Sequence, residues 1–329
     1  MISTEMKEEC DRRRDEIEHD AKFQEWISDI KCCVNMYKNV QDDRIRISNQ
    51  SKKKKGGDKQ KIPENQKNWK ISAEQTNFNK AAIEERWANE KKIEARLKEL
   101  VSNKDYPIYN DFLQYITGFG PTSAAYLLAT FRPERIYYVT NLWAFAGIVT
   151  GKDKLVKGTK ASFNTFLKSK LLGVIGSNFM QNKSEYALYY YQKRIHLINR
   201  DIQLIKAGKM CEKFGEHEDG KLDRLTAAHH ARMATRDMIQ MFVRDYYVGY
   251  RTIMNIPVIP GYAEAVLNLS HVGESFVSYD LIREWSKETP EQHKARRQEV
   301  LRRLNEMKKT LDSLCIRYGY REDTNDTEE

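Results

Sequence analysis

Apolar residues return every three or four positions along several long stretches of this chain, which is the spacing of one face of an α-helix. Residues 5–40 show the pattern first, with apolar members that step by 4, 3, 4 and 3 positions: Phe23, Ile27, Ile30, Val34 and Tyr37. Residues 290–315 repeat the same steps: Val300, Leu304, Met307, Leu311 and Leu314. Alternation with a period of two, the pattern of a half-buried strand, is almost absent. The sequence therefore predicts an all-α protein.

Six further segments carry helical signals between these two ends. A serine that suits an N-cap position, Ser72, precedes an apolar face that reaches about residue 103. The others follow at residues 122–131, 140–148, 162–179, 184–206 and 222–254. A polar stretch with four consecutive lysines, broken by Gly-Gly and Pro, separates the first helix from the second. We therefore expect four regions: an N-terminal helix (1–48), a basic linker (49–71), a helical domain (72–210) and a long-helix C-terminal region (211–329).

A tight turn with two glycines one residue apart, Gly118-Phe119-Gly120-Pro121, is the most informative short sequence. Helical segments precede and follow it, so residues 111–131 are predicted to form a helix–hairpin–helix. We expect Gly120 to need a positive φ. Backbone N–H groups at a helix start suit a phosphate. The predicted contacts are made by the backbone of Gly118, Phe119, Gly120 and Thr122; in the alternative, the glycines only permit close helix packing.

Charge is distributed unevenly and favours the same region. The chain of 329 residues is 31% charged and 40% hydrophobic, with a formal net charge of +9. Residues 111–210 hold 14 Lys and Arg against 5 Asp and Glu, so this segment alone carries a net charge of +9. A basic loop within it adds four candidate phosphate contacts: Lys152, Lys154, Lys157 and Lys160. A polyanion is expected to approach this segment first, although a merely soluble basic surface has the same composition.

The longest predicted helix in the C-terminal region, residues 222–254, has one face that changes character. Nine residues step along it by 4 and 3, polar in the first half and apolar in the second: Leu225, His229, Arg232, Arg236, Ile239, Val243, Tyr246, Tyr250 and Ile253. Charged groups on a face that enters the core need a partner, such as a phosphate or a carboxylate. His229, Arg232 and Arg236 therefore join the candidate nucleic-acid-binding residues. In the alternative, the helix simply leaves the core there.

Two stretches of the basic segment resemble a known family. FLQYITGFGPTSAAYLLATF (112–131), followed by NLWAFAGIV (141–149), is similar to the C-terminal domain of bridge-RNA-guided, DEDD-type insertion-sequence transposases. In that family a helix–hairpin–helix precedes a Leu-x-x-Tyr-x-Gly-Leu block, and this chain has Leu142, Phe145, Gly147 and Ile148 at those places. The resemblance covers about residues 110–200. It implies that the chain binds DNA and takes part in DNA recombination, namely the transposition of a mobile element.

The same resemblance implies catalytic groups that this chain does not clearly contain. The family's enzymes hold divalent metal with four carboxylates on a β-sheet domain and use a serine nucleophile in a loop after the Gly-Leu block. Residues 1–110 show no strand that ends in an aspartate, and the loop at residues 150–159 has no serine. Thr159 and Ser162 are the nearest hydroxyls, although Ser162 also suits a helix N-cap. Catalysis is left open, and Mg²⁺ is expected only if the chain is an enzyme.

Other cofactors and a membrane location are not indicated. The spacing of Cys211, His217, His229 and His230 matches no standard zinc site, so no metal site is predicted. The sequence has no run of 18 apolar residues, a charged N-terminal stretch, and five scattered cysteines. We therefore expect a cytoplasmic, nucleoid-associated protein that does not enter a membrane.

Three functions stay open on the sequence. The favoured one is a nucleic-acid-binding protein related to insertion-sequence transposases, with DNA ahead of RNA as the partner. The second is an active transposase or recombinase that catalyses DNA strand transfer. The third is a helical scaffold that forms homo-oligomers through its apolar faces at residues 23–37 and 300–314.

Overall fold

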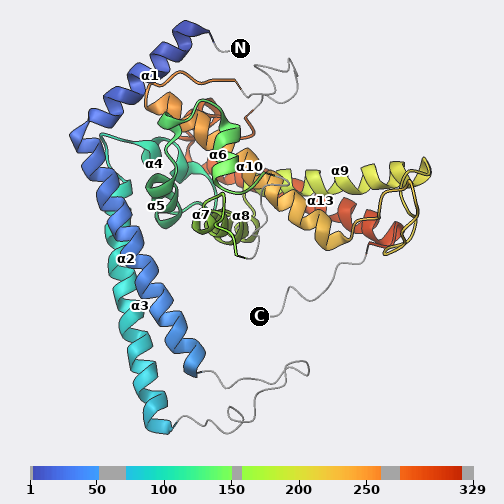
Figure 1. Cartoon of the computed structure of the whole chain (residues 1–329), viewed down its shortest axis with the longest axis horizontal. Helices are drawn as coiled ribbons and strands as arrows, with labels where there is room; N and C mark the ends of the chain where they lie inside the picture. Colours follow the sequence, from blue (N-terminus) through green and yellow to red (C-terminus); the bar gives the residue numbers. More distant parts are fainter. Residues whose placement is uncertain (1–2, 52–71, 150–157, 261–274, 321–329) are drawn as a thin grey trace.

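The computed structural model describes residues 3–51, 72–149, 158–260 and 275–320. Within these ranges all regular structure is helical apart from one isolated β-bridge, between Met210 and Leu222, which confirms the all-α prediction. Figure 1 shows a central head, a two-helix N-terminal arm and a C-terminal arm that points away from it. None of the helices in the described ranges combines the length and the hydropathy that crossing a membrane requires.

The N-terminal arm consists of α2 (Ala21–Ser51) and α3 (Ala73–Val101), which lie antiparallel (Figure 1). The single helix expected for residues 5–40 is broken after α1 (Thr4–His19). Asp20 takes an extended ψ of 99°, and its carboxylate accepts the N–H of Phe23 (3.1 Å). An aspartate that caps a helix start in this way begins a new helix and lets the chain change direction.

The end of the N-terminal arm nearest the head is closed by apolar contacts. The predicted face at residues 23–37 is buried, as expected. Trp26 donates its indole N–H to the carbonyl oxygen of Leu100 (2.7 Å) and stacks on Tyr106 with 5.0 Å between ring centroids. At the far end of α3, Ser72 accepts the N–H of Gln75 (3.1 Å), which confirms the predicted N-cap.

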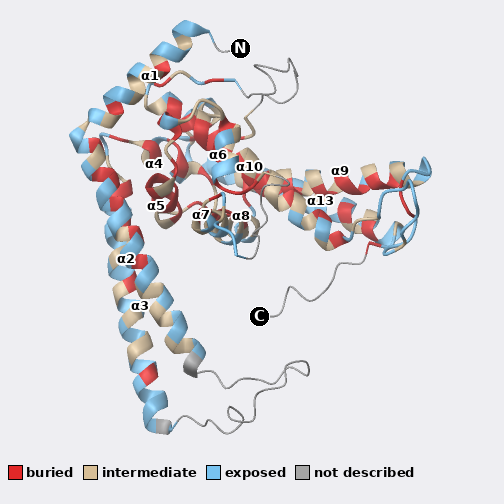
Figure 2. Ribbon diagram, in the orientation of Figure 1, coloured by how far each residue is buried: buried red, intermediate tan, exposed pale blue. Residues whose placement is uncertain are grey.

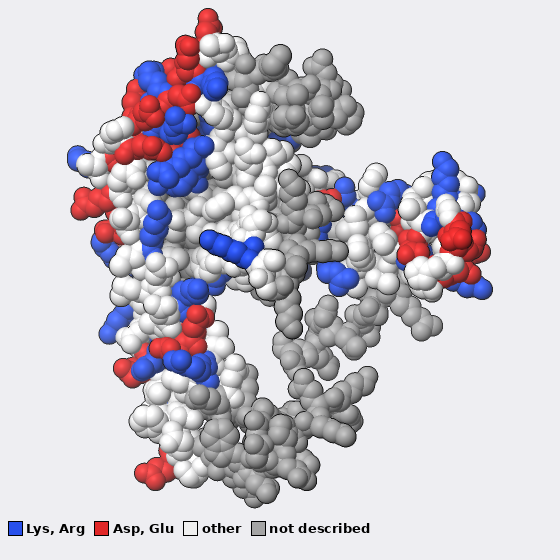
Figure 3. All heavy atoms as spheres, in the orientation of Figure 1, with Lys and Arg blue, Asp and Glu red and all other residues white. Residues whose placement is uncertain are grey.

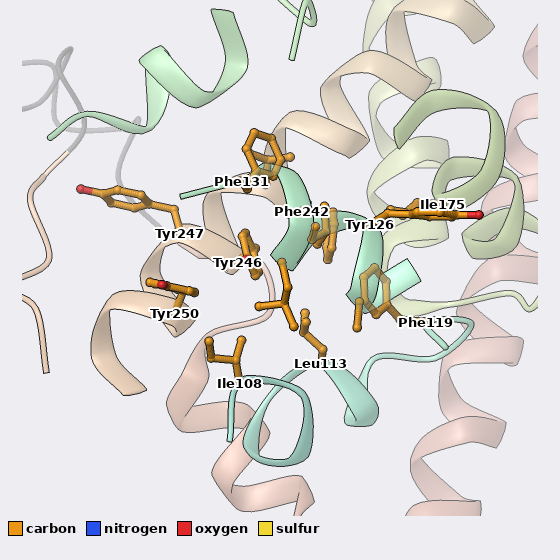
Figure 4. Packing of buried hydrophobic residues seen from close by; sticks show 14 of the residues in the cluster. Ile108, Leu113, Phe119, Tyr126, Phe131, Ile175, Phe242, Tyr246, Tyr247 and Tyr250 are labelled. Atoms are coloured by element: carbon orange, nitrogen blue, oxygen red, sulfur yellow. The ribbon is translucent and has the colours of Figure 1, made fainter. Parts of the chain in front are cut away.

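The head contains the shorter helices together with the C-terminal half of α10 (Ala227–Ile253). Its other members are α4 (Ile108–Asp111), α5 (Pro121–Thr130), α6 (Val139–Phe145), α7 (Thr165–Ser169), α8 (Gly176–Gln181) and α12 (Tyr279–Trp285). The core is strongly aromatic (Figure 4): the ring of Phe242 lies 5.1 Å from Phe119 and 5.2 Å from Phe179, measured between centroids. These contacts join α10 to the glycine turn and to α8.

The helix expected at residues 162–179 starts later and is not uniform. Asn164, not Ser162, is its N-cap, because the Asn164 side chain accepts the N–H of Leu167 (3.0 Å). Between α7 and α8 the backbone widens into a π-helical turn, η4 (Lys170–Ile175). A turn of this kind holds one extra residue and shifts the side chains that follow it. The prediction of Ser162 as an N-cap was therefore wrong.

The C-terminal arm is a bundle of three helices: α9 (Glu185–Lys206), the N-terminal half of α10, and α13 (Pro290–Arg317). Two small apolar clusters close it, one around Ile198, Leu311 and Tyr320 and one around Leu188 and Leu304. α13 begins with a capping box between Thr289 and Gln292. Figure 2 shows buried residues continuing along this arm away from the head.

The buried face of α10 is not the one that the sequence predicted over its whole length. In the head, the predicted members Ile239, Val243, Tyr246 and Tyr250 are buried. In the part of α10 before Ile239, the buried members are Ala227, His230, Ala234 and Met238, next to the predicted ones. The face shifts because the helix passes from α9 and α13 to the different neighbours of the head.

The two apolar faces expected to drive self-association are used within the chain. Residues 23–37 pack in the main core, and Val300, Leu304 and Leu311 pack against α9 and its surroundings. Neither face is free to meet a second copy. Self-association through these two faces would require the chain to open.

Candidate nucleic-acid interface

The glycine turn lies in the head, between a 3-10 turn and α5. α4 ends at Asp111, and Phe112 leaves the helical region with φ −136° and ψ −68°. Leu113–Tyr115 then form a 3-10 turn. Phe112 and Leu113 are both fully buried, whereas neighbours on a regular helix point about 100° apart. The expected helix–hairpin–helix therefore has its second helix, whereas the first is interrupted at Phe112.

The two glycines of the turn have different roles, and the expectation for Gly120 was wrong. Gly118 has the positive φ (80°), and a Cβ there would lie 2.9 Å from the carbonyl oxygen of Asn178. Gly120 has φ −95°, which any residue adopts, and nothing lies within 4 Å of where its Cβ would be. Gly118 thus lets the turn pack closely against α8, whereas Gly120 leaves open space at the start of α5.

The start of α5 has the features of an anion site. Gly120 is its N-cap, Pro121 is its first residue, and no side chain caps it. Phe119 is buried against Phe242, so that its backbone alone faces the turn, and Thr122 is half-buried in the first helical turn. Unsatisfied N–H groups and the helix dipole together attract negative charge at such a position. The four residues predicted from the sequence lie together here, but the N–H of Phe119 is already donated to the carbonyl oxygen of Ile116 (3.1 Å), so Phe119 offers none to a phosphate.

Two cations that the sequence analysis missed border this turn. Arg297 of α13 donates to the carbonyl oxygens of Asn182 (3.0 Å) and Lys183 (3.1 Å), in the link between α8 and α9. Asn182 also packs against Gly118. Lys183 is exposed and has a positive φ of 52°. No sequence signal marks Arg297, because it lies 114 residues beyond Lys183, whose carbonyl oxygen it contacts.

A carboxylate also lies near the turn, but its charge is balanced. The hydroxyl of Thr117 donates to Glu185 (3.3 Å). Glu185 is buried and pairs with Arg296 (2.9 Å), and Arg297 is 3.9 Å away. Together with Lys183, these groups leave an excess of positive charge beside the turn. We refer to residues 117–122, Lys183 and Arg297 as the basic turn.

Burial removes most acidic side chains of the basic segment from the surface. Of its carboxylates in the described ranges, Glu134, Glu185 and Asp201 are buried and paired with arginines, and Asp111 is exposed. In Figure 3 the central surface shows Lys and Arg with little acidic surface, whereas the two signs mix along α1 and α2. Few negative charges therefore remain on the surface of this segment, and cations make up a larger share of its exposed charged groups than of its sequence.

A cluster of lysines and aromatic rings lies further along α5. Lys170 lies 4.7 Å from the ring centroid of Tyr126 and 5.5 Å from that of Phe166, and Lys38 of α2 lies 5.3 Å from the Phe166 ring. Burial and the nearby Lys38 lower the pKa of Lys170 below its usual value. Tyr126 is five residues beyond Pro121, roughly 7.5 Å along the helix axis. Tyr126 is buried and Phe166 is half-buried, so these rings offer little surface on which a base could stack.

The basic loop and its hydroxyls are described only in part. Lys152, Lys154 and Lys157 lie outside the described residues. Lys160, Thr159 and Ser162 are all exposed, in the segment that leads to α7. Phe163 is the next residue after Ser162, and the ammonium group of Lys168 lies 4.8 Å from its ring centroid. This contact is a further pairing of a lysine with an aromatic ring in the same segment.

The charged half of α10 lies on a different part of the surface from the basic turn. His229 and Arg232 are exposed and Arg236 is half-buried. Burial and then the neighbouring cations, Arg232 first, lower the pKa of His229 below its usual value. One turn further on, Thr235 approaches Gly176 of α8, which links this half of α10 to the head. The structure thus brings α10 close to α8, but it does not place His229, Arg232 and Arg236 at the basic turn.

A buried acid–base pair in the C-terminal arm was also missed. His230 and Asp201 are completely buried, and His230 Nε2 lies 2.9 Å from Asp201 Oδ2. Burial alone would raise the pKa of Asp201, but hydrogen bonds from His230 and Arg200 outweigh it and hold this pKa below its usual value. The pair is structural, since it joins α9 to α10 inside the bundle. The charged partner anticipated for this helix is thus a carboxylate, and it serves His230 instead of His229.

No metal cluster emerges among the residues that the structure describes: no three His, Cys, Asp or Glu side chains gather closely enough to hold an ion. His217 instead pairs with Asp223 (2.7 Å) on the surface. A scan against family models, a search of curated proteins and a search of solved structures each find no match to this chain.

Proposed function

We propose that this chain binds nucleic acid through the basic turn, with duplex DNA as the preferred partner ahead of RNA. The observation that carries the proposal is the uncapped start of α5, open above Gly120, in a turn whose Gly118 packs against the α8–α9 link that holds Lys183 and that Arg297 contacts. A phosphate seated there would accept backbone N–H groups and lie close to two cations. Contacts of this kind hold the backbone of the nucleic acid and do not read bases.

The relation to insertion-sequence transposases is part of the same proposal. Besides the turn, its support is Gly147, which stands at the glycine of the family's Gly-Leu block. Gly147 has φ 66°, and a Cβ there would lie 2.4 Å from the ring of Phe163. A glycine is thus required at this position by both backbone conformation and packing.

Binding to duplex DNA, single-stranded DNA and RNA over a series of salt concentrations tests the proposal. Affinity for duplex DNA is expected to fall steeply with salt, because binding releases counterions from the phosphates. Lys183→Glu is expected to weaken binding about tenfold at low salt and to reduce the salt slope by about 1. Lys309→Glu, the same charge change at an exposed position of α13, is the matched control. Equal losses in both variants, or no binding by the unaltered protein, would contradict the proposal.

A second variant tests the open space at the start of α5. Valine fits the φ of −95° at Gly120 and clashes with nothing there, so Gly120→Val is expected to fold normally. Its side chain would occupy the place proposed for the phosphate and lower the affinity about tenfold. Unchanged affinity in a folded Gly120→Val protein would show that the turn is only structural.

A further inference from the structure

In the outer half of the N-terminal arm, residues 38–49 and 74–92, a charged pair lies between the helices and three large apolar side chains are exposed. Between the helices, Arg44 pairs with the buried Glu90 (2.5 Å), and nearer the head Tyr37 donates to Glu94 (2.8 Å). Ile45, Phe78 and Trp87 are 43%, 68% and 48% exposed. Figure 2 shows mostly exposed and half-buried residues along this part of the hairpin. This pattern is the reverse of a hairpin that is stable alone in water.

Two opposite charges flank the exposed tryptophan on α3. Glu84 and Lys91 are seven residues apart, two helical turns, so that they lie on one side of the helix. Both are exposed, with Trp87 and Ala88 midway between them. Within the described part of the chain, neither Glu84 nor Lys91 makes an ion pair. The guanidinium of Arg44 covers Trp87 at 4.1 Å from the ring centroid, yet about half of this side chain stays accessible.

We propose that this face of α3 binds the same face of a second copy of the chain, with the two α3 helices antiparallel. A two-fold axis between Trp87 and Ala88 sets Glu84 of each copy opposite Lys91 of the other, so both unpaired charges find partners. The same axis brings the two Trp87 side chains to the centre of the contact, beside the small Ala88 residues. An isologous contact of this kind uses one patch twice and closes after two subunits.

Charge decides between a second copy and a nucleic acid as the occupant of this face. Residues 73–92 hold four Lys and Arg and four Glu, so their net charge is zero and they exert no net attraction on a polyanion. A face with one acidic and one basic residue in this antiparallel register is complementary to itself. The proposal is independent of nucleic-acid binding at the basic turn.

Sedimentation equilibrium of the full chain over a range of concentrations tests the dimer. The unaltered protein is expected to be dimeric at micromolar concentration, and Trp87→Glu to be monomeric. Glu84→Lys and Lys91→Glu each set like charges opposite each other twice in the dimer and are expected to weaken it about tenfold. The double variant, Glu84→Lys with Lys91→Glu, restores both pairs with reversed sign and is expected to dimerise like the unaltered protein.

Controls separate this proposal from its alternatives. Ile316→Glu, at an 84% exposed position of α13, should leave the dimer intact. Circular dichroism should be the same for all variants, because the changed side chains are exposed. A monomeric unaltered protein, or a charge-exchanged double variant as weak as the single ones, would overturn the proposal. So would a Trp87→Glu protein that keeps its mass and loses DNA affinity, since this result would assign the face to nucleic acid.

Discussion

The two arms solve the problem of burying apolar surface in opposite ways. The C-terminal arm has three helices and encloses two apolar clusters, with the Asp201–His230 pair completely buried between α9 and α10. The N-terminal arm has two helices, and in its outer half Trp87 stays exposed while the Arg44–Glu90 pair occupies the seam.

The difference shows what a third helix contributes. Two helices meet along one narrow seam, which in the outer N-terminal arm buries Glu90 but leaves Trp87 about half exposed. A third helix adds a second seam, and the C-terminal arm buries both members of the Asp201–His230 pair completely. Consequently we expect the C-terminal arm to unfold together with the head, and the outer N-terminal arm to open by itself.

Both arms extend from the head, and the largest expected effect on stability comes from a buried carboxyl group there, Asp245. Burial raises the pKa of Asp245 to about 7, although it accepts hydrogen bonds from Tyr186 (2.7 Å), Val277 (2.8 Å) and Phe276 (3.1 Å). The folded chain therefore keeps a proton that the unfolded chain releases near pH 4. The stability associated with this group is present at low pH and is lost as the pH rises from about 4 to 7, by about 4 kcal/mol.

Denaturant unfolding at pH 4.5 and pH 8 measures this effect when the unaltered protein is compared with Asp245→Asn. Asparagine does not titrate, so the variant is expected to gain about 3 kcal/mol relative to the unaltered protein between these pH values, which is the part of the total effect that falls in this range. A difference between the two proteins that stays the same at both pH values would show that Asp245 keeps an ordinary pKa in the fold.

The buried pair of the C-terminal arm is the next largest case. His230→Ala leaves the buried Oδ2 of Asp201 without its hydrogen-bond partner, although Arg200 remains 2.8 Å from Oδ1. We expect the free energy of unfolding to fall by about 3 kcal/mol. His229→Ala, one residue earlier and exposed, should change it by about 0.5 kcal/mol or less. Equal effects of the two changes would mean that the arm is not closed as described.

The glycine turn meets both arms, since α5 packs on α2 and Gly118 faces the link to α9. Gly118→Ala is expected to destabilise the chain by about 2 kcal/mol, because its φ of 80° disfavours a side chain and the Asn178 oxygen is too close. Gly120→Ala should change the stability by about 0.5 kcal/mol or less. Thermal unfolding of the two variants measures this difference. A larger loss of stability in Gly120→Ala than in Gly118→Ala would contradict the roles given to the two glycines.

The smallest expected effect is local and lies in the N-terminal arm. Arg44→Ala removes the partner of Glu90 and the cover of Trp87. Amide hydrogen exchange in residues 38–49 and 74–92 should become about tenfold faster, while global unfolding stays unchanged within about 0.5 kcal/mol. Arg46→Ala, which removes an exposed ion pair with Asp43, is the control. A global loss of stability in Arg44→Ala would show that the arm unfolds with the head.

Local sequence signals predicted the helices well where a cap or a long apolar face was present. Thr289 and Gln292 form the capping box that starts α13 at Pro290, the residue at which the predicted helix begins. The break at Asp20 and the π-helical turn before Gly176 were not anticipated, because both depend on contacts made in the folded chain. The same is true of Arg297, whose approach to the turn has no local signature.

The sequence alone determined the helical class of this protein, the position of the glycine turn and the concentration of positive charge around it, because periodicity, glycine and charge are local properties of the chain. Only the tertiary structure decided which glycine takes the positive φ, which histidine is buried and which carboxylates leave the surface. Each of those outcomes depends on what packs against a residue from elsewhere in the chain. Gly118 meets α8, His230 meets Asp201, and Glu185 meets Arg296, and no spacing within the sequence encodes these meetings.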